Sequence, residues 1–127
     1  MSYVLQSRGE GEPAEMRVSG TALGLLCELL GSGLAGRPGA VVAGKLASMA
    51  VITPEECRLL AGSLQAVPEE TVTGAIQEIA RALSQELGGD FDHMLEPKAV
   101  AKSRKFLERF AEFAHKCAEG DGFSLVS

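Results

Sequence analysis

The chain has 127 residues, of which 46% are apolar, and it carries a net charge of −5 with a sequence pI near 5.0. We expect residues 1–127 to form a single domain, because a chain of this length buries enough surface to fold without a metal or disulfide bonds. The apolar content excludes a disordered chain, and the acidic balance excludes a general affinity for nucleic acids or anionic membranes.

The N-terminal residues, 1–19, predict a β-hairpin. The segments SYVLQS (residues 2–7) and MRVS (residues 16–19) contain aromatic or β-branched residues, and the stretch RGEGEPAE between them is typical of a turn. Ser19 or Thr21 is expected to cap the helix that follows.

Residues 20–119 predict a helical core of about five helices, and the first two are nearly uncharged. The first is expected to end near Leu30, and the second to extend from about residue 38 or 39 to Met49. Neither apolar segment reaches the roughly 20 residues that a membrane-spanning helix needs, and Glu28 and Lys45 interrupt them. We therefore predict buried core helices and no membrane span.

The third helix has the clearest start in the chain. Thr53 is followed by Pro54 and then by Glu56, the pattern of a capping box with proline at the first helical position. This helix is expected to end near Ala66.

The fourth and fifth helices are predicted to begin at Pro68 and Pro97. The fifth carries an apolar face of residues spaced by four, three and four positions: Phe106, Phe110, Phe113 and Cys117. Within residues 120–127, the segment FSLV is expected to form a terminal strand that pairs with residues 3–5. The predicted fold class is mainly α, with a small antiparallel sheet formed by the N- and C-terminal segments.

The three cysteines, Cys27, Cys57 and Cys117, have no paired spacing, so neither a disulfide framework nor a zinc ribbon is expected. Each lies on the apolar face of a predicted helix, which favours a reduced, cytoplasmic protein. Residues 1–15 lack the basic start and apolar run of a signal peptide.

The MSYVL start, the ITPEECRLLAGSL segment and the FLERFAEFAHKCAEGDGF segment together resemble small uncharacterised bacterial proteins, in which a short strand precedes helices and a Gly-Phe strand ends the chain. The resemblance implies a bacterial source. It implies no site residues.

A G-x-G-x-x-G sequence spans residues 31–36, and Glu55 or Glu56 follows about twenty residues later, as in a dinucleotide-binding fingerprint. That fingerprint needs a strand before the glycines and a second parallel strand after the helix. Because the preceding segment is predicted to be helical, we favour a glycine-rich joint between two helices.

The densest group of potential ligand atoms lies in the linker after the fourth helix, at Asp90, Asp92, His93 and Glu96. Carboxylate oxygens and imidazole nitrogen suit a cation or a small ligand. The alternative is a solvated acidic turn in which Asp92 or Glu96 caps a helix. We favour this turn over a metal site.

The fifth helix carries a basic stripe, which we define as Lys98, Lys102, Lys105 and Arg109. Residues 97–119 contain six basic and three acidic residues, a net charge of +3, whereas residues 65–96 contain one basic and seven acidic, a net charge of −6. The stripe is either a solvated face partly neutralised by the acidic segment or a docking surface for an acidic protein. Nucleic acid is disfavoured, because the aromatic residues lie on a neighbouring face.

We predict a non-catalytic protein-interaction module of a bacterial cytoplasm, such as an inhibitor, an immunity-like partner or an adaptor. The partner is expected to be another protein, with no cofactor and no membrane contact. The Gly20-xxx-Gly24 spacing and the Phe-rich fifth helix also allow a homodimer. The alternative is a small-ligand-binding or catalytic domain with a pocket near residues 90–96. No residue is predicted to be catalytic.

Overall fold

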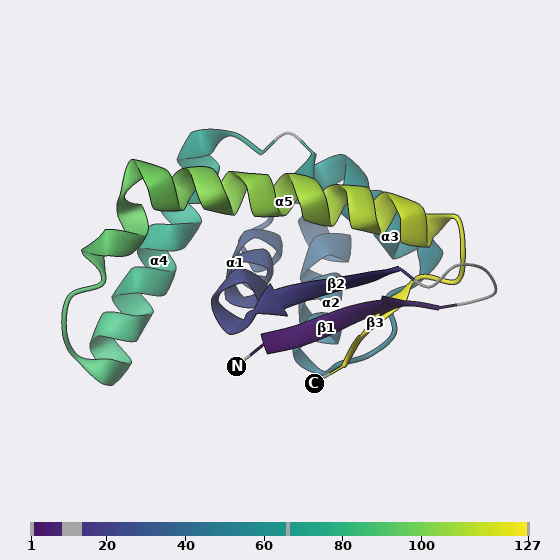
Figure 1. Ribbon diagram of the computed structural model, residues 1–127, viewed down its shortest axis with the longest axis horizontal. Coiled ribbons are helices and arrows are strands. Elements are labelled where there is room, and N and C mark those ends of the chain that lie inside the picture. The colour runs from purple at the N-terminus through teal and green to yellow at the C-terminus, as the bar shows by residue number, and fades with distance from the viewer. Residues whose placement is uncertain (1, 9–13, 66, 127) are drawn as a thin grey trace.

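A computed structural model describes residues 2–8, 14–65 and 67–126, and it is mainly helical with one small antiparallel sheet (Figure 1). The strands are β1 (Ser2–Ser7), β2 (Glu15–Ser19) and β3 (Phe123–Val126). The helices are α1 (Gly20–Gly31), α2 (Gly36–Ala47), α3 (Pro54–Leu64), α4 (Glu69–Leu87), the short 3-10 helix η1 (Asp92–Leu95) and α5 (Pro97–Ala118). The predicted fold class is confirmed. Residues 9–13 of the predicted hairpin loop, and the predicted helix end at Ala66, lie outside the described residues.

The sheet has the strand order β2-β1-β3, so β1 is its central strand. Leu5 pairs with Met16 on one side and with Leu125 on the other. All three side chains are buried, because strand residues alternate between faces and these point toward the helices. The predicted pairing between the two terminal segments is confirmed, but its register differs: β3 pairs with residues 4–7, where residues 3–5 were expected, and Phe123 lies opposite Ser7.

The core lies between the sheet and the helices. Helix α5 runs along one side of the molecule with α3 packed against its C-terminal half, while α1 packs against α2 and α4 (Figure 1). Phe110 is fully buried, and its ring meets Phe123 edge-on at a centroid distance of 5.9 Å. Phe113 also packs on Phe123, at 5.4 Å. The aromatic face of α5 thus joins the helices to the sheet.

The predicted capping box of α3 is present. The Thr53 Oγ1 atom accepts a hydrogen bond from the Glu56 backbone N–H at 3.2 Å, and Glu56 Oε1 accepts one from the Thr53 N–H at 3.0 Å. Lys45 Nζ donates to the same carboxylate at 2.7 Å. Partial burial raises the pKa of Glu56, but the hydrogen bonds from Lys45 and Thr53 outweigh this effect and the pKa is lowered.

The glycine-rich motif is a joint between helices, as we favoured. Helix α1 ends at Gly31 and α2 begins at Gly36, so a helix precedes the glycines where a nucleotide-binding unit needs a strand. Helix α2 begins at Gly36, earlier than predicted, and Pro38 lies within its first turn. Proline is tolerated there because the backbone N–H groups of a first turn have no acceptor within the helix.

The remaining tests concern the cysteines and the apolar helices. All three cysteines are free thiols, with Cys57 and Cys117 buried and Cys27 half-buried. Among the described helices, none combines the length and the apolar character that crossing a membrane requires.

Candidate functional site

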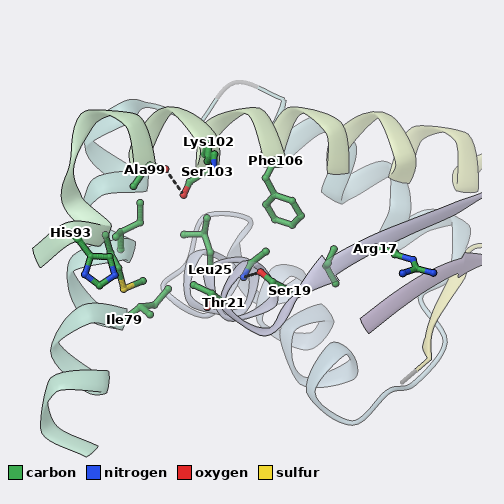
Figure 2. Close-up of a pocket in the computed structure, with 14 residues that line it drawn as sticks. Arg17, Ser19, Thr21, Leu25, Ile79, His93, Ala99, Lys102, Ser103 and Phe106 are labelled. Atoms are coloured by element: carbon green, nitrogen blue, oxygen red, sulfur yellow. Dashed lines mark hydrogen bonds between the residues drawn. The ribbon is translucent and has the colours of Figure 1, made fainter. Parts of the chain in front are cut away.

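A groove of about 430 Å³ lies between the end of β2, the start of α1, the middle of α4, η1 and the N-terminal half of α5 (Figure 2). We call it the α1–α5 groove. Most of its lining is apolar, and the residues of this kind are Val18, Ala22, Leu25, Ile76, Ile79, Met94, Ala99 and Phe106. Phe106 projects from α5 toward the end of β2 and is half-buried (Figure 2).

The groove also has a set of polar residues, namely Arg17, Ser19, Thr21, His93, Lys102 and Ser103. Two of them form hydrogen bonds with backbone groups (Figure 2). Ser19 Oγ caps α1 by accepting a hydrogen bond from the Ala22 N–H at 3.0 Å, and Ser103 Oγ donates to the Ala99 carbonyl oxygen at 3.1 Å. Within the described part of the chain, the side chains of Arg17, His93 and Lys102 form no hydrogen bond or ion pair.

The charge of the lining is one-sided. Arg17 and Lys102 are cationic, and no Asp or Glu is among the lining residues, although the chain as a whole has a net charge of −5. A ligand in the groove would therefore meet an apolar floor with positive charge at its margin, where the Arg17 guanidinium points away from the other lining side chains (Figure 2). This arrangement suits an apolar ligand that carries negative charge.

The basic stripe contributes one residue to this groove. Lys98, Lys102, Lys105 and Arg109 are all exposed on α5, but only Lys102 lines the groove. The ion pairs found among the described residues are Lys45 with Glu56 and Arg81 with Glu78, so no acidic residue of α4 or of the linker neutralises the stripe by direct pairing. All four side chains of the stripe are thus exposed, with no ion pair among the described residues.

The linker candidates are divided between two sides of η1. His93 lines the α1–α5 groove, whereas Asp90 and Asp92 line a separate hollow beside Arg81. Asp90 Oδ1 accepts a hydrogen bond from the Asp92 backbone N–H at 2.8 Å, which makes it a turn-forming residue. Glu96 precedes α5 without a side-chain capping bond.

The four linker residues are therefore not gathered into one site. No cluster of three or more metal-ligating side chains occurs in residues 2–8, 14–65 and 67–126. Of the four, His93 alone lines the α1–α5 groove, where Lys102 is the residue of the basic stripe that also lines it.

A second cavity, of about 540 Å³, lies between α3 and α5. Its apolar floor is formed by Ala61 and Ala111, and its other residues carry both signs of charge: Gln65, Glu108, Glu112, His115 and Lys116. The small alanine side chains offer a ligand little apolar contact. Because the charged side chains have both signs, they favour neither an anionic nor a cationic ligand. We therefore take the α1–α5 groove as the candidate site.

Most of the groove was not predicted from the sequence. Arg17 was assigned only to a predicted strand, Leu25 and Ile76 fall only within predicted helices, and Phe106 was assigned to the apolar face of its helix. The available signal was the spacing of Phe106 and Lys102, which places a large apolar residue one helical turn from a basic one.

Comparisons of the chain with protein-family models, with curated proteins and with solved structures found no match.

Proposed function

We propose that this chain is a non-catalytic protein-interaction module that holds an apolar, acidic segment of a partner protein in the α1–α5 groove. The observation that supports the proposal is the one-sided charge of the groove, which has Arg17 and Lys102 and no carboxylate in a protein of net charge −5. Electrostatic complementarity of this kind selects acidic partners and speeds association.

The apolar floor supplies the affinity. Phe106, Leu25 and Ile79 come from three different helices and line the same cavity. Each large apolar side chain that a partner buries there contributes roughly 1.5 to 3 kcal/mol to binding before the entropy cost of association. Half-buried Phe106 is the natural anchor, since aromatic residues dominate binding energy at interfaces.

The rest of the basic stripe acts at longer range. Lys98 and Lys105 lie outside the groove lining but on the same helix as Lys102. Their charges raise the rate of encounter with an acidic partner and depend on salt, because exposed charges are screened over about 10 Å at 0.1 M ionic strength.

We further propose that the module acts in a bacterial cytoplasm. The free state of the three cysteines supports this location, since thiols persist in a reducing compartment. A homodimer stays a prediction. Two observations favour it: the space around the Gly24 Cβ position is open, and the Met49 side chain is exposed. Gly24 and Met49 line the same cavity beside α1 and α2.

A small amphipathic anion is the second candidate occupant of the groove. The volume of about 430 Å³ falls within the range of small-molecule sites, roughly 300 to 1,000 Å³, and the lining is mainly apolar. This candidate replaces the predicted pocket of linker carboxylates, because Asp90 and Asp92 face another hollow and only His93 faces this one.

The test is selection of binding peptides from a random displayed library against the whole protein, followed by fluorescence anisotropy with the strongest binder. Lys102→Glu is the test variant and Lys116→Glu is its matched control, because both residues are exposed on α5, only Lys102 lines the groove, and Lys116 lies outside the basic stripe. Decanoate is titrated separately as a probe for the small-anion candidate.

We expect the selected peptides to be rich in acidic and apolar residues. Their binding should be at least about fivefold weaker to Lys102→Glu and should change less than about twofold with Lys116→Glu. Failure to select any peptide, or equal effects of the two variants, would overturn the proposal. Binding of decanoate without peptide binding would favour the small-anion candidate in its place.

A further inference from the structure

The α1–α5 groove runs beside a strand edge that pairs with no other strand among residues 2–8, 14–65 and 67–126. β2 is an outer strand of the sheet, and its residues Arg17, Val18 and Ser19 line the groove. The unpaired edge of a strand presents backbone N–H and C=O groups that can pair with another extended chain.

The hydrogen-bond pattern shows which groups these are. The Ser7 N–H donates to the Ala14 carbonyl oxygen at 2.9 Å, so residues 7 and 14 form a hydrogen-bonded pair in the same register as the rest of the β1–β2 ladder. Because hydrogen-bonded pairs alternate with non-hydrogen-bonded pairs, the backbone groups of Arg17 point away from β1.

The hydrogen bonds between β1 and β3 also indicate that the backbone groups of Arg17 point away from β1. The Arg8 N–H donates to the Gly122 carbonyl oxygen at 2.9 Å, which continues the β1–β3 register, so the backbone groups of Val4 are directed to β3. Val4 is the residue opposite Arg17. Neither the N–H nor the carbonyl oxygen of Arg17 has a partner outside the sheet within the described residues.

The two outer edges of the sheet differ. At the β3 edge, Phe123 is already paired with Ile52 through two backbone hydrogen bonds. At the β2 edge, the groove lies where a partner strand would be, and its far wall is formed by α5 at Ala99, Ser103 and Phe106 (Figure 2).

We propose that the partner segment binds in an extended conformation, as a fourth strand on the free edge of β2 beneath α5. This inference rests on the proposed function, because it concerns the same groove. Main-chain hydrogen bonds to Arg17 hold the segment, and its side chains give specificity, as in other complexes formed by strand addition.

Strand geometry also specifies the sequence of the segment. Arg17 is exposed and Val18 is 3% exposed, so the two point to opposite faces of the sheet. A residue opposite Arg17 in the added strand lies on the same face as Arg17 and is favoured when acidic. Its neighbours on the Val18 side face Leu25 and Ile76 and are favoured when apolar. The occupant is an extended peptide with alternating acidic and apolar residues.

The test compares Arg17→Pro with Arg17→Ala, using the labelled peptide selected from the library. Both variants remove the guanidinium, but only proline removes the backbone N–H that points into the groove, and proline is tolerated at an outer edge because the β1 ladder does not use that N–H. We expect Arg17→Pro to bind at least about fivefold more weakly than Arg17→Ala, the effect of roughly one lost hydrogen bond.

A second measurement leaves the protein unchanged. N-methylation of the peptide at successive residues removes one backbone N–H at a time, and strand pairing predicts weak binding at every second position. Equal binding by the two Arg17 variants, or an N-methylation profile without a period of two, would overturn strand addition. If Lys102→Glu still weakens the same peptide, the proposed function stands while this inference falls.

Discussion

Ile52 and Phe123 exchange two backbone hydrogen bonds. The Ile52 N–H donates to the Phe123 carbonyl oxygen at 2.8 Å, and the Phe123 N–H donates to the Ile52 carbonyl oxygen at 3.1 Å. This bridge attaches β3 to the segment that leads into α3. It also brings Gly122, with a φ of 83°, so close to Ile52 that a Cβ atom there would overlap the Ile52 carbonyl oxygen.

Gly122→Ala is therefore expected to destabilise the protein by at least about 2 kcal/mol, because the left-handed backbone and the overlap with Ile52 both oppose a side chain. Urea denaturation measures the change. Gly24→Ala is the control. Apart from its chain neighbours and the backbone of its own helix, nothing lies within 4 Å of its Cβ position in the middle of α1, so we expect no loss, or a gain of up to about 1 kcal/mol. Equal stability of both variants and the wild type would show that the Ile52–Phe123 bridge does not hold Gly122 in this geometry.

The carboxylate of Glu56 predicts a pH dependence. Because its pKa in the folded protein lies below the ordinary value of 4.5, the stabilisation it provides is present above that value and is lost as the pH falls through the folded pKa. Glu56→Gln is expected to be less stable than the wild type at pH 7 by up to about 1 kcal/mol, and this difference should shrink below pH 4.5. Thermal melts over the range measure it.

Glu55→Gln is the matched control for Glu56, since Glu55 is exposed in the same first turn of α3. Its effect is expected to stay below about 0.5 kcal/mol at all pH values. A pH profile for Glu56→Gln that ran parallel to the wild type would contradict the role given to the Lys45 and Thr53 contacts.

The three thiols should differ in reactivity. Burial, and then the neighbouring Cys117, raises the pKa of Cys57 to about 12, and burial raises that of Cys117 to about 11. Cys27 is half-buried, and burial raises its pKa as well. Since the thiolate is the reactive form, we expect iodoacetamide at pH 8 to modify Cys27 first and the other two only after unfolding. Peptide mass spectrometry follows each site, and early modification of Cys57 would contradict the packing of α3 on α5.

Variants of two phenylalanines of α5 distinguish a core residue from a groove residue. Phe110 is fully buried, so Phe110→Ala is expected to cost about 3 to 5 kcal/mol of stability. Phe106 is half-buried at the groove, so Phe106→Ala should cost clearly less and weaken binding of the selected peptide. Denaturant midpoints and anisotropy on both variants check this. If Phe106→Ala were as destabilising as Phe110→Ala, Phe106 would belong to the core.

The parts of the fold that were predictable depend on local chemistry. Thr53 and Glu56 are three residues apart, so their mutual hydrogen bonds required no knowledge of the tertiary structure. The apolar spacing along α5 was equally local. The start of α2 at Gly36 and the short helix η1 were missed, since packing against α1 and α4 determines those boundaries as much as the sequence does.

The candidate site was predictable only in fragments. Lys102 and His93 were both singled out in the sequence, but as members of two unrelated groups. The structure brings both to one groove because η1 turns His93 away from Asp90 and Asp92. The contribution of Arg17 depends on which edge of the sheet remains open, and that edge is determined by the long-range pairing of β1 with β3.

The central place of β1 also affects how the protein folds. Its pairing with β2 joins neighbouring segments, whereas its pairing with β3 joins residues from opposite ends of the described chain. Closing that long loop costs conformational entropy, and contacts of high sequence separation slow folding. We expect helices and the β1–β2 pair to form first and β3 to dock last. Until it does, the β1–β2 pair has an open edge on each of its two strands, and the chain is most exposed to association with other copies.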